Sequence, residues 1–464
     1  MQSAAPTDTI DGGAHPRREE VALVSKATER PAGKSDAIAA AKVVCLVGLG
    51  YVGLPMAALL ASRGFRVTGV DTNPAVREAL TAGTATGEAG VDELLRAALG
   101  AERLSVAATP PLADVFIIAV PTPLAEGNEA DLSAVRAAAR SLAPALRPGN
   151  LVVLESTVPP GTTERVLVPE LERSGLRAGR DLLVAHVPER VLPGNALAEL
   201  RHNARVIGGI DQASAEAAHD VYASFVEGEI HLTDARTAEM VKLMENTYRD
   251  VNIALANEFA LLAQDLGVDI RRAIELANHH PRVEVLQPGP GVGGHCIPVD
   301  PWFLAAASAE PAPLIRAARA VNDAMPERVA AMLREAVAGI ERPVVALLGL
   351  SYKAGADDTR NSPAIAIAKR LRSWGHELRL HDPLVVELPG WQATCPTPLE
   401  AATGADCLAL LTDHPEFAAL DPTALRGVMR RPLVFDTRGL VDAAAWRAAG
   451  FEVRQLGAPP APSS

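Results

Sequence analysis

The stretch Gly48-Leu49-Gly50-Tyr51-Val52-Gly53 follows an apolar segment, Lys42–Val47, and precedes a helical pattern. In such a turn the first glycine permits the tight bend, the second lets a pyrophosphate approach the backbone, and the third lets helix and strand pack closely. The positive end of the helix dipole then faces the phosphates. The stretch predicts a dinucleotide-binding turn whose glycines, Tyr51 and Val52 contact the cofactor. A glycine-rich turn without a ligand is the alternative.

Asp71 closes the next predicted strand, 23 residues after Gly48, where an acid can hold the ribose hydroxyls of a dinucleotide. A carboxylate there repels the extra phosphate of NADP, so Asp71 favours NAD, although Arg77 nearby could soften that repulsion. Thr122 follows another strand-like segment, Val115–Ala119, at the sheet edge where ligands bind. It is a further candidate cofactor contact, with an ordinary turn as the alternative.

Short apolar strands alternate with helical stretches on both sides of one long helical pattern. That pattern runs from about Ala235 to Leu266, longer than a typical globular helix, which favours a helix that joins two domains or two subunits. Near-continuous apolar strands are typical of parallel sheets covered by helices on both faces. Before the long helix the predicted strands are Lys42–Val47, Arg66–Val70, Val115–Ala119, Leu151–Glu155 and Asp181–His186. After it they are Val344–Leu348, Glu377–His381, Cys407–Leu411, Pro432–Asp436 and Glu452–Gln455.

The expected fold class is therefore α/β, with two Rossmann-like, doubly wound parallel-sheet domains joined by a helical central domain. The predicted boundaries are a flexible tail over 1–41, an NAD-binding domain over 42–228, a helical domain over 229–338, a second Rossmann-like domain over 339–457 and a tail over 458–464. Residues 43–61 are apolar and long enough to span a bilayer, but their glycines and Pro55 divide them into strand, turn and helix. No membrane association is expected.

Composition limits the class of function. The chain has 464 residues, 48% of them hydrophobic, and a formal charge of −12, which argues against a nucleic-acid binder. The cysteines at 45, 296, 395 and 407 match neither a zinc-ligand spacing nor a disulfide framework, so no metal is expected. Because the sequence also shows no secretion signal, the cysteines fit a reducing cytoplasm.

Three polar residues of the long helical pattern are candidates for chemistry. Lys242, Asn246 and Arg249 lie at positions i, i+4 and i+7, which places them on one face. A solvated polar stripe is the commoner meaning of this spacing. A lysine partly removed from water at such a face would have a lowered pKa and could act as a general base.

Cys296 lies in Pro288–Pro301, a run rich in glycine and proline. Glycine lets another molecule approach closely, so this thiol would be reachable, whereas most free cysteines are buried and inert. A tight loop around a core cysteine is the alternative. Asp300, followed by Pro301, is expected to be the N-cap of the next helix. If that helix end points towards Cys296, it favours the thiolate.

Together these motifs resemble the nucleotide-sugar 6-dehydrogenase family, which includes UDP-glucose and GDP-mannose dehydrogenases. The similarity extends from Val43 to Leu440. It rests on Gly48–Pro55, Ser156–Pro159, Pro188–Arg190, Lys242–Asn246, Gly293–Asp300, Leu350–Lys353 and Asp358–Arg360. Within the family, the stretches Glu189–Gly194, Tyr248–Ala254, His280–Arg282 and Gln287–Phe303 are most similar to members that act on UDP-N-acetyl-D-mannosamine.

The resemblance implies a four-electron oxidation of the sugar's primary alcohol to a carboxylate, with two NAD molecules used in turn. A thiolate suits this reaction, because it captures the aldehyde as a thiohemiacetal and then carries a thioester that water hydrolyses. The implied substrate is UDP-N-acetyl-D-mannosamine; UDP-N-acetylglucosamine, UDP-glucose or another nucleotide sugar is the alternative. By position, the implied roles are Cys296 as nucleophile, Lys242 as general base and oxyanion stabiliser, Asn246 and Asp300 as orienting groups, Glu189 in hydrolysis, and Thr157 near the reacting centre and cofactor.

The resemblance also implies a set of substrate contacts, in which arginine and lysine suit a diphosphate. It places Arg282 in a neighbouring subunit's site, so a homodimer or higher homo-oligomer is expected. Arg360 would reach the cofactor from the last domain, which implies domain closure on binding. The implied substrate contacts are Arg190, Val191, Lys242, Asn246, Arg249, His280, Arg282, Gly293, Tyr352, Lys353 and Arg438.

Other classes fit the sequence less well. A two-electron dehydrogenase of the 6-phosphogluconate type would share the nucleotide domain and the long helix but has no use for Cys296 in this loop. A short-chain epimerase would need Tyr-x-x-x-Lys, and Tyr222, Tyr248 and Tyr352 lack a lysine four residues later. A non-catalytic NAD sensor would not need Lys242, Cys296 and Asp300 together.

Overall fold

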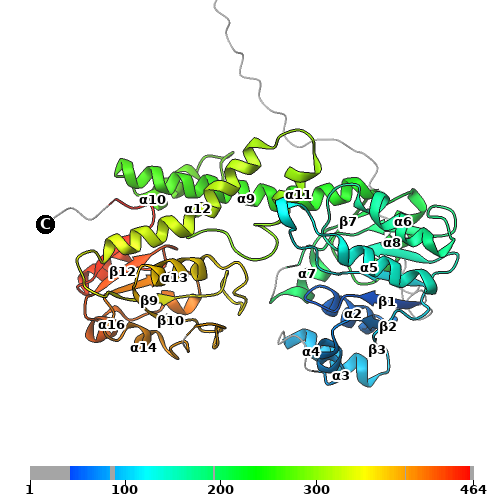
Figure 1. The fold of residues 1–464 in the computed structure, drawn as a ribbon, viewed down its shortest axis with the longest axis horizontal. Coiled ribbons are helices and arrows are strands. Elements are labelled where there is room, and N and C mark those ends of the chain that lie inside the picture. Colours follow the sequence, from blue (N-terminus) through cyan, green and yellow to red (C-terminus); the bar gives the residue numbers. More distant parts are fainter. Residues whose placement is uncertain (1–41, 84–88, 192–193, 392, 460–464) are drawn as a thin grey trace, which may run out of the picture.

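The computed structural model describes residues 42–83, 89–191, 194–391 and 393–459. Two α/β domains lie side by side, and helices bridge them along one edge (Figure 1). The first domain is coloured blue to green and the second yellow to red. The tail predicted over 1–41, and residues 460–464 of the tail predicted over 458–464, lie outside the described residues.

The first domain is built on an eight-stranded sheet with the order β3-β2-β1-β4-β5-β6-β7-β8. Neighbouring strands are parallel, except that β7 runs antiparallel to β6. The strands are β1 Val43–Val47, β2 Arg66–Val70, β3 Leu104–Ala107, β4 Val115–Ile118, β5 Leu151–Leu154, β6 Leu183–His186, β7 Arg205–Gly209 and β8 Ile230–Asp234. The helices are α2 Gly53–Ser62, α3 Pro74–Thr81, α4 Ala89–Gly100, α5 Ser133–Leu142, α6 Val168–Leu171, α7 Ala196–His202 and α8 Gln212–Tyr222, with a π-helical turn at Thr163–Leu167 and 3₁₀ turns at Glu126–Asn128, Ala143–Ala145 and Glu172–Ser174.

Alternation along β1 explains why helices cover both faces of this sheet. Val44 and Leu46 point into one buried cluster, which also contains Leu60 of α2. Cys45 and Val47 point into the opposite cluster. Because successive strand residues point to opposite faces, an apolar run buries both of them. The first domain is therefore doubly wound.

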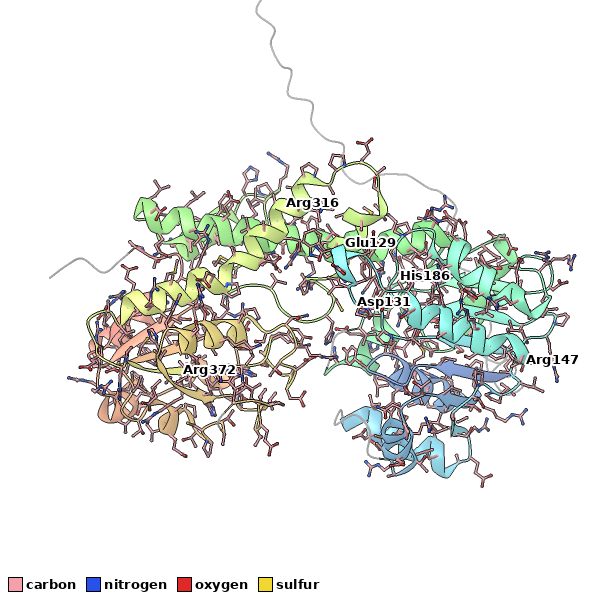
Figure 2. All side chains as sticks on the ribbon, in the orientation of Figure 1. Glu129, Asp131, Arg147, His186, Arg316 and Arg372 are labelled. Carbon is pink, nitrogen blue, oxygen red and sulfur yellow. The ribbon has the colours of Figure 1, made fainter. Side chains whose placement is uncertain are left out.

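The bridge consists mainly of two long helices, α9 Ala235–Leu266 and α12 Pro313–Ala336, which pack along each other. The side chain of Asp234 caps α9 by accepting a 2.8 Å hydrogen bond from the Thr237 N–H. Gly267, with φ of 70°, ends it in the left-handed conformation. Two shorter helices complete the bridge, α10 Ile270–Ala277 and α11 Asp300–Ala307. The turn Glu126–Asn128 of the first domain contacts α11, so Glu129 lies beside the bridge (Figure 2).

The second domain holds a five-stranded, wholly parallel sheet with the order β10-β9-β11-β12-β13. One face of it packs against α12 through Val329 and Leu333, which share a buried cluster with Val345 and Leu347 of β9. The strands are β9 Val344–Leu348, β10 Glu377–His381, β11 Cys407–Leu410, β12 Leu433–Asp436 and β13 Glu452–Gln455. The helices are α13 Pro363–Ser373, α14 Pro398–Ala402, α15 Pro415–Ala418, α16 Pro422–Val428 and α17 Ala443–Ala448.

The predicted fold class is confirmed, with two local differences. Strands β3, β7 and β8 were not predicted, since they are short or carry charged and polar residues, as Arg205 does in β7. The antiparallel β7 also departs from the all-parallel sheet that was expected. The apolar stretch 43–61 forms β1, a turn and α2. Among the described residues, no helix has the length and apolar character needed to cross a membrane.

Candidate active site

The glycine turn after β1 lies where the strand order of the first sheet reverses, between β1 and β4. Ligands of open α/β sheets bind at such a point. A Cβ atom on Gly48 would come 2.5 Å from the Ala119 carbonyl oxygen, and one on Gly53 would come 1.9 Å from the Gly48 oxygen. A Cβ on Gly50 would meet nothing within 4 Å. The outer glycines are thus required by packing, and Gly50 leaves the space that a pyrophosphate needs.

Asp71 is oriented beside this turn by backbone donors. Its carboxylate accepts hydrogen bonds from the N–H groups of Leu49, at 3.0 Å, and Asn73, at 2.8 Å. Arg77 donates to the Asp71 carbonyl oxygen, at 2.7 Å, rather than to the carboxylate. An open hollow of about 570 Å³ adjoins it, lined by Arg77, Glu78 and Thr81 of α3 and by Val106–Ala108. The sequence indicated that Arg77 could soften the repulsion between Asp71 and the extra phosphate of NADP, and the structure places Arg77 beside Asp71 and along this hollow.

The loops that follow β4 and β5 are fastened to each other. The Thr122 hydroxyl donates to the Thr157 carbonyl oxygen, and the Ser156 hydroxyl donates to the Val120 carbonyl oxygen, both at 2.7 Å. Glu239 of α9 then holds the loop after Thr157, because its buried carboxylate accepts 2.7 Å hydrogen bonds from the N–H and the hydroxyl of Thr163 and a further bond from the Gly161 N–H. The sequence reading missed Glu239, although it precedes Lys242 by one helical turn.

One ion pair and one hydrogen bond define the buried centre of the site. Lys242 Nζ lies 3.1 Å from Glu189 Oε1, and Asn246 Nδ2 donates to Asp300 Oδ2 at 2.6 Å. Lys242 and Asn246 are one turn apart on α9, so they face the same way. Glu189 Oε2 accepts a 2.7 Å bond from the Val191 N–H. Lys242, Glu189 and Asp300 are all at most 9% exposed.

The protonation of this centre differs from the sequence prediction. Burial alone would lower the pKa of the Lys242 ammonium, but the carboxylates of Glu189 and Asp300 outweigh burial and raise that pKa above its usual range. The predicted lowered lysine pKa is wrong, because the partners of Lys242 come from distant segments. Burial raises the pKa of Asp300 to about 6, against the opposing effects of Lys242 and of the hydrogen bond from Asn246.

Cys296 is exposed, in agreement with a reachable thiol, yet it is not predisposed to ionise. Enclosure by neighbouring protein, and then the carboxylates of Asp300 and Glu189, raise its pKa to about 12, while Lys242 and Arg360 act against this. The N–H groups of Val299 and Asp300 donate to the Cys296 carbonyl oxygen, at 3.0 and 2.8 Å, rather than to the sulfur. A helix start was expected to favour the thiolate only if it points towards Cys296; the N–H groups of Val299 and Asp300 bond the carbonyl oxygen instead, and the thiol pKa is raised.

Asp300 also has a different structural role from the predicted one. It is the first residue of α11, Val299 occupies the N-cap position, and no side chain caps that helix end. The Asp300 carboxylate instead turns to Asn246 of α9. The N-cap prediction is wrong because a long-range partner captures the carboxylate that local sequence would assign to capping.

The loop that carries Cys296 is held by the second domain. The Gly294 N–H donates to the Arg360 carbonyl oxygen at 3.2 Å, and Asn361 Nδ2 donates to the Gly294 oxygen at 3.0 Å. His295 Nε2 lies 2.8 Å from Asp358 Oδ2, and the Arg360 guanidinium pairs with the same carboxylate at 2.7 Å. Sequence reasoning missed Asp358 as a site residue, although the Asp-Thr-Arg motif contains it.

The remaining candidates divide into two groups. Arg190 bonds the Ala204 carbonyl oxygen and pairs with Glu245, and Arg438 pairs with Asp413 at 2.9 Å. Tyr352 packs its ring against Gly294 of the cysteine loop. By contrast, Arg249, His280 and Arg282 are exposed on the bridge, and the structure does not bring them to the buried centre of the same chain.

An open α/β sheet with a glycine-rich turn at its switch point, together with a buried lysine and an exposed cysteine, is typical of a cofactor-dependent dehydrogenase. Models of the UDP-glucose/GDP-mannose dehydrogenase family match in three parts: the NAD-binding domain over 42–226, the central domain over 236–324 and the UDP-binding domain over 346–443. The chain belongs to this family. It is an NAD-dependent UDP-sugar dehydrogenase, and the resemblance seen in the sequence is confirmed.

Individual relatives cover nearly the whole chain. UDP-N-acetyl-D-mannosamine dehydrogenase of Methanocaldococcus jannaschii is 44% identical over 90% of this chain and 96% of its own length. NDP-N-acetyl-D-galactosaminuronic acid dehydrogenase of Ralstonia nicotianae is 45% identical over 87% of this chain and 97% of its own length. The structure of the UDP-D-ManNAc dehydrogenase of Pyrococcus horikoshii superposes with a TM-score of 0.84, at 44% identity, and covers 89% of this chain and 99% of that one.

Proposed function

We propose that this chain oxidises UDP-N-acetyl-D-mannosamine to UDP-N-acetyl-D-mannosaminuronate in two successive two-electron steps at one site. The observation that carries the proposal is the buried Lys242–Glu189 pair, with Asp300 bonded to Asn246 one helical turn along α9 and with the exposed thiol of Cys296. The relatives named for that activity support the sugar. A sibling nucleotide sugar is the second candidate, favoured by the equally similar Ralstonia protein named for a galactosamine derivative.

The cofactor's place is supported by the open space at Gly50 and the oriented Asp71 carboxylate. NAD, when bound, accepts one hydride in each of the two oxidation steps. The residues that would hold it are the glycine turn, Asp71, Thr122 and Thr157 of the first domain, with Arg360 from the second. Arg77, beside the hollow at α3, joins this set.

Proton transfer follows from the pKa directions. With a raised pKa, Lys242 is an ammonium group at neutral pH, so it stabilises an alkoxide or another oxyanion directly. Lys242 can accept the proton of the sugar alcohol only by passing one of its own to Glu189, whose carboxylate oxygen is 3.1 Å away. Lys242 therefore combines the roles of general base and oxyanion stabiliser, because it passes the proton of the alcohol on to Glu189.

Cys296 keeps the half-oxidised sugar in place. Its sulfur adds to the aldehyde carbon while its proton goes to the aldehyde oxygen, which gives a thiohemiacetal. Loss of a hydride and of the hydroxyl proton leaves a thioester, and water then releases the carboxylic acid and restores the thiol. Asn246 and Asp300, joined by a 2.6 Å hydrogen bond, would orient that water, and Glu189 would assist.

The substrate contacts proposed are those at the domain junction together with the exposed arginines of the bridge. The UDP-binding domain contributes Tyr352, Lys353 and Arg438.

Arg249, His280 and Arg282 would act in a homodimer, in which Arg282 enters the partner's site. An exposed apolar face of α9 supports that dimer, and its members are Met240, Met244, Tyr248, Leu255, Phe259, Leu262 and Leu266. A cytoplasmic location stays a prediction from the sequence.

Formation of NADH across a panel of UDP- and GDP-sugars tests the proposal. We expect the highest kcat/KM with UDP-N-acetyl-D-mannosamine, and the second candidate predicts a different UDP-sugar as best. Cys296→Ser should lower overall turnover at least about 100-fold while NAD still binds, because the aldehyde loses its covalent acceptor. Cys395→Ser is the matched control and should keep wild-type turnover. No NADH with any nucleotide sugar would contradict the proposal.

A further inference from the structure

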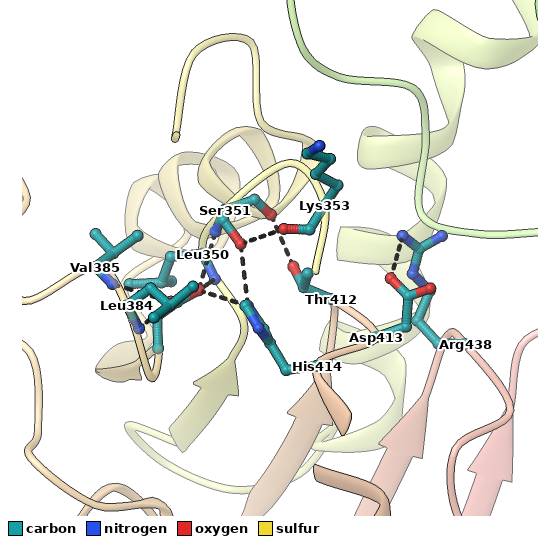
Figure 3. A network of polar contacts seen from close by, with 10 residues as sticks. Leu350, Ser351, Lys353, Leu384, Val385, Thr412, Asp413, His414 and Arg438 are labelled. Atoms are coloured by element: carbon teal, nitrogen blue, oxygen red, sulfur yellow. Dashed lines mark hydrogen bonds and ion pairs between the residues drawn. The ribbon is translucent and has the colours of Figure 1, made fainter. Parts of the chain in front are cut away.

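A buried polar cluster lies at the carboxyl ends of three strands in the second domain (Figure 3). Ser351 follows β9, Asp382 follows β10, and Thr412 and His414 follow β11. Each of the four is at most 5% exposed. Polar groups removed from water to this degree are retained only with hydrogen-bond partners, so their contacts show what the cluster does.

Ser351 is bonded at every polar atom it has. Its N–H donates to Asp382 Oδ2 at 3.1 Å, and its carbonyl oxygen accepts from the Thr412 hydroxyl at 2.8 Å. Its hydroxyl donates to the Lys353 carbonyl oxygen at 2.9 Å and lies 3.0 Å from His414 Nε2. These four contacts fix the backbone of the segment Ser351–Lys353.

The same contacts exclude a nucleophilic serine. A serine–histidine–aspartate relay needs the serine on one ring nitrogen and the carboxylate on the other. Here His414 Nε2 faces both the Ser351 hydroxyl and Asp382 Oδ2, at 3.0 and 3.2 Å. Asp382 also accepts bonds from the N–H groups of Leu350, Leu384 and Val385. Burial would raise the pKa of Asp382, but the hydrogen bond from His414, together with those from the N–H groups of Leu350, Leu384 and Ser351, lowers it below the usual range.

The segment fixed by the cluster reaches the cysteine loop. The Tyr352 N–H donates to the Asp358 carbonyl oxygen at 3.0 Å. A Cβ atom added to Gly293 would come 2.8 Å from the Tyr352 Cβ, and one added to Gly294 would come 2.9 Å from its ring. Tyr352 therefore packs directly against the two glycines that precede His295 and Cys296. A shift of the segment would be transmitted to the loop through this contact.

We propose that Ser351, Asp382, Thr412 and His414 are positioning residues, which set Tyr352 and Lys353 for the nucleotide sugar and, through Tyr352, support the Cys296 loop. This role deepens the proposed function and rests on it for the identity of the ligand. None of the four residues needs to touch substrate, since all are buried behind the segment that they hold. His414 is the centre of the cluster, because it joins the ends of β9, β10 and β11.

The test measures UDP binding, NAD binding and thermal unfolding in His414→Ala, His414→Gln and Phe417→Leu. Gln carries an amide nitrogen where Nε2 lies, so it can restore the two contacts. Phe417 packs its buried ring on His414, with ring centroids 5.4 Å apart, and its substitution lowers stability without removing a hydrogen bond. We expect His414→Ala to weaken UDP binding about tenfold, by loss of positioned hydrogen bonds, with NAD binding unchanged.

His414→Gln should recover most of the UDP affinity, and Phe417→Leu should keep it while the melting temperature falls. Wild-type UDP affinity in His414→Ala would overturn the proposal, as would a loss in Phe417→Leu that follows stability. A second readout does not depend on the substrate: the rate of Cys296 alkylation by iodoacetamide should change at least about threefold in His414→Ala, because the loop loses support. A wild-type chain that binds no UDP would contradict the proposed function, and unchanged alkylation would then contradict the positioning role.

Discussion

In each sheet of this protein the first strand in the chain is followed by the same kind of turn, but the side chains in the two turns differ. After β1 the chain reads Gly48-Leu49-Gly50-Tyr51, and after β9 it reads Gly349-Leu350-Ser351-Tyr352. Gly48 donates to the Val70 oxygen at 2.8 Å, and Gly349 donates to the His381 oxygen at 2.9 Å. In both turns the following leucine N–H donates to the aspartate that ends the next strand, Asp71 or Asp382.

The difference lies at the third position and in the acid. Gly50 leaves open space, and the Asp71 carboxylate accepts hydrogen bonds from the N–H groups of Leu49 and Asn73. Ser351 fills the corresponding position, and its contacts with His414 close the turn around Asp382. One backbone pattern thus leaves open space in the first domain and holds a buried hydrogen-bonded cluster in the second. A strand, a turn and an acid do not define a ligand site until the side chains that occupy the turn are known.

The largest expected effect is on stability. Asp382→Ala should lower the free energy of unfolding by about 3–5 kcal/mol, because it leaves several buried donors without an acceptor. Asp71→Ala should cost less than about 1 kcal/mol, since its carboxylate is not buried in a network. Denaturant unfolding of both variants measures the contrast. Equal losses of unfolding free energy in the two variants would mean that Asp71 and Asp382 have the same structural role.

Introducing the serine of the second turn into the first should weaken cofactor binding. Gly50→Ser places a side chain in the space left for the pyrophosphate, so NAD affinity should fall about 100-fold with little change in stability. Gly100→Ala is the matched control, because a Cβ there also meets nothing within 4 Å. Isothermal titration with NAD measures the effect, and wild-type affinity in Gly50→Ser would place the pyrophosphate elsewhere.

Asp300 and Asp382 are both buried, but their pKa values shift in opposite directions, so the comparison extends to the pH dependence of stability. Asp300 has a pKa raised to about 6, so the stability linked to its protonated form is present below its unfolded pKa and is lost as pH rises towards about 6. Asp382 has a lowered pKa, so its contribution is lost as pH falls. We expect the difference in unfolding free energy between wild type and Asp300→Asn to change by about 2 kcal/mol between pH 4 and 7. A difference that does not vary with pH would be inconsistent with the raised pKa.

The smallest effect expected is that of Asp71 on cofactor affinity. Asp71→Ala should weaken NAD binding about tenfold by loss of the ribose contact, while UDP binding stays unchanged. Unaltered NAD affinity would mean that other groups, with Arg77 the nearest, hold the ribose.

Local patterns were enough to predict most of the fold. The long helix was predicted from about Ala235 to Leu266 by its helical apolar pattern, and α9 has these bounds. In the structure Asp234 caps its start and Gly267 ends it. The second-domain strands were predicted within one residue at each end. Three of them, β9, β11 and β12, are short apolar runs bounded by turns, and in β10 apolar and polar residues alternate. By contrast, β7 carries a buried arginine and two glycines, and such a strand is visible only in its sheet.

The site was harder to predict because its electrostatics are long-range. The sequence indicated Lys242, Asp300 and Cys296 as candidate site residues, but it could not predict how their pKa values shift. Lys242 meets Glu189 from 53 residues away, and this partner reverses the predicted shift of the lysine pKa. Asp358 and His414 were missed for the same reason, since their contacts join loops that are far apart in the sequence.

The number of NADH molecules formed per nucleotide sugar consumed tests the central claim most directly. The assay uses the intact chain, a limiting amount of UDP-N-acetyl-D-mannosamine and excess NAD, and it quantifies the acid by mass spectrometry. Two NADH per sugar, with no free aldehyde detected, is the predicted result, because Cys296 holds the half-oxidised sugar for the second step. One NADH per sugar, with aldehyde as the product, would contradict the account.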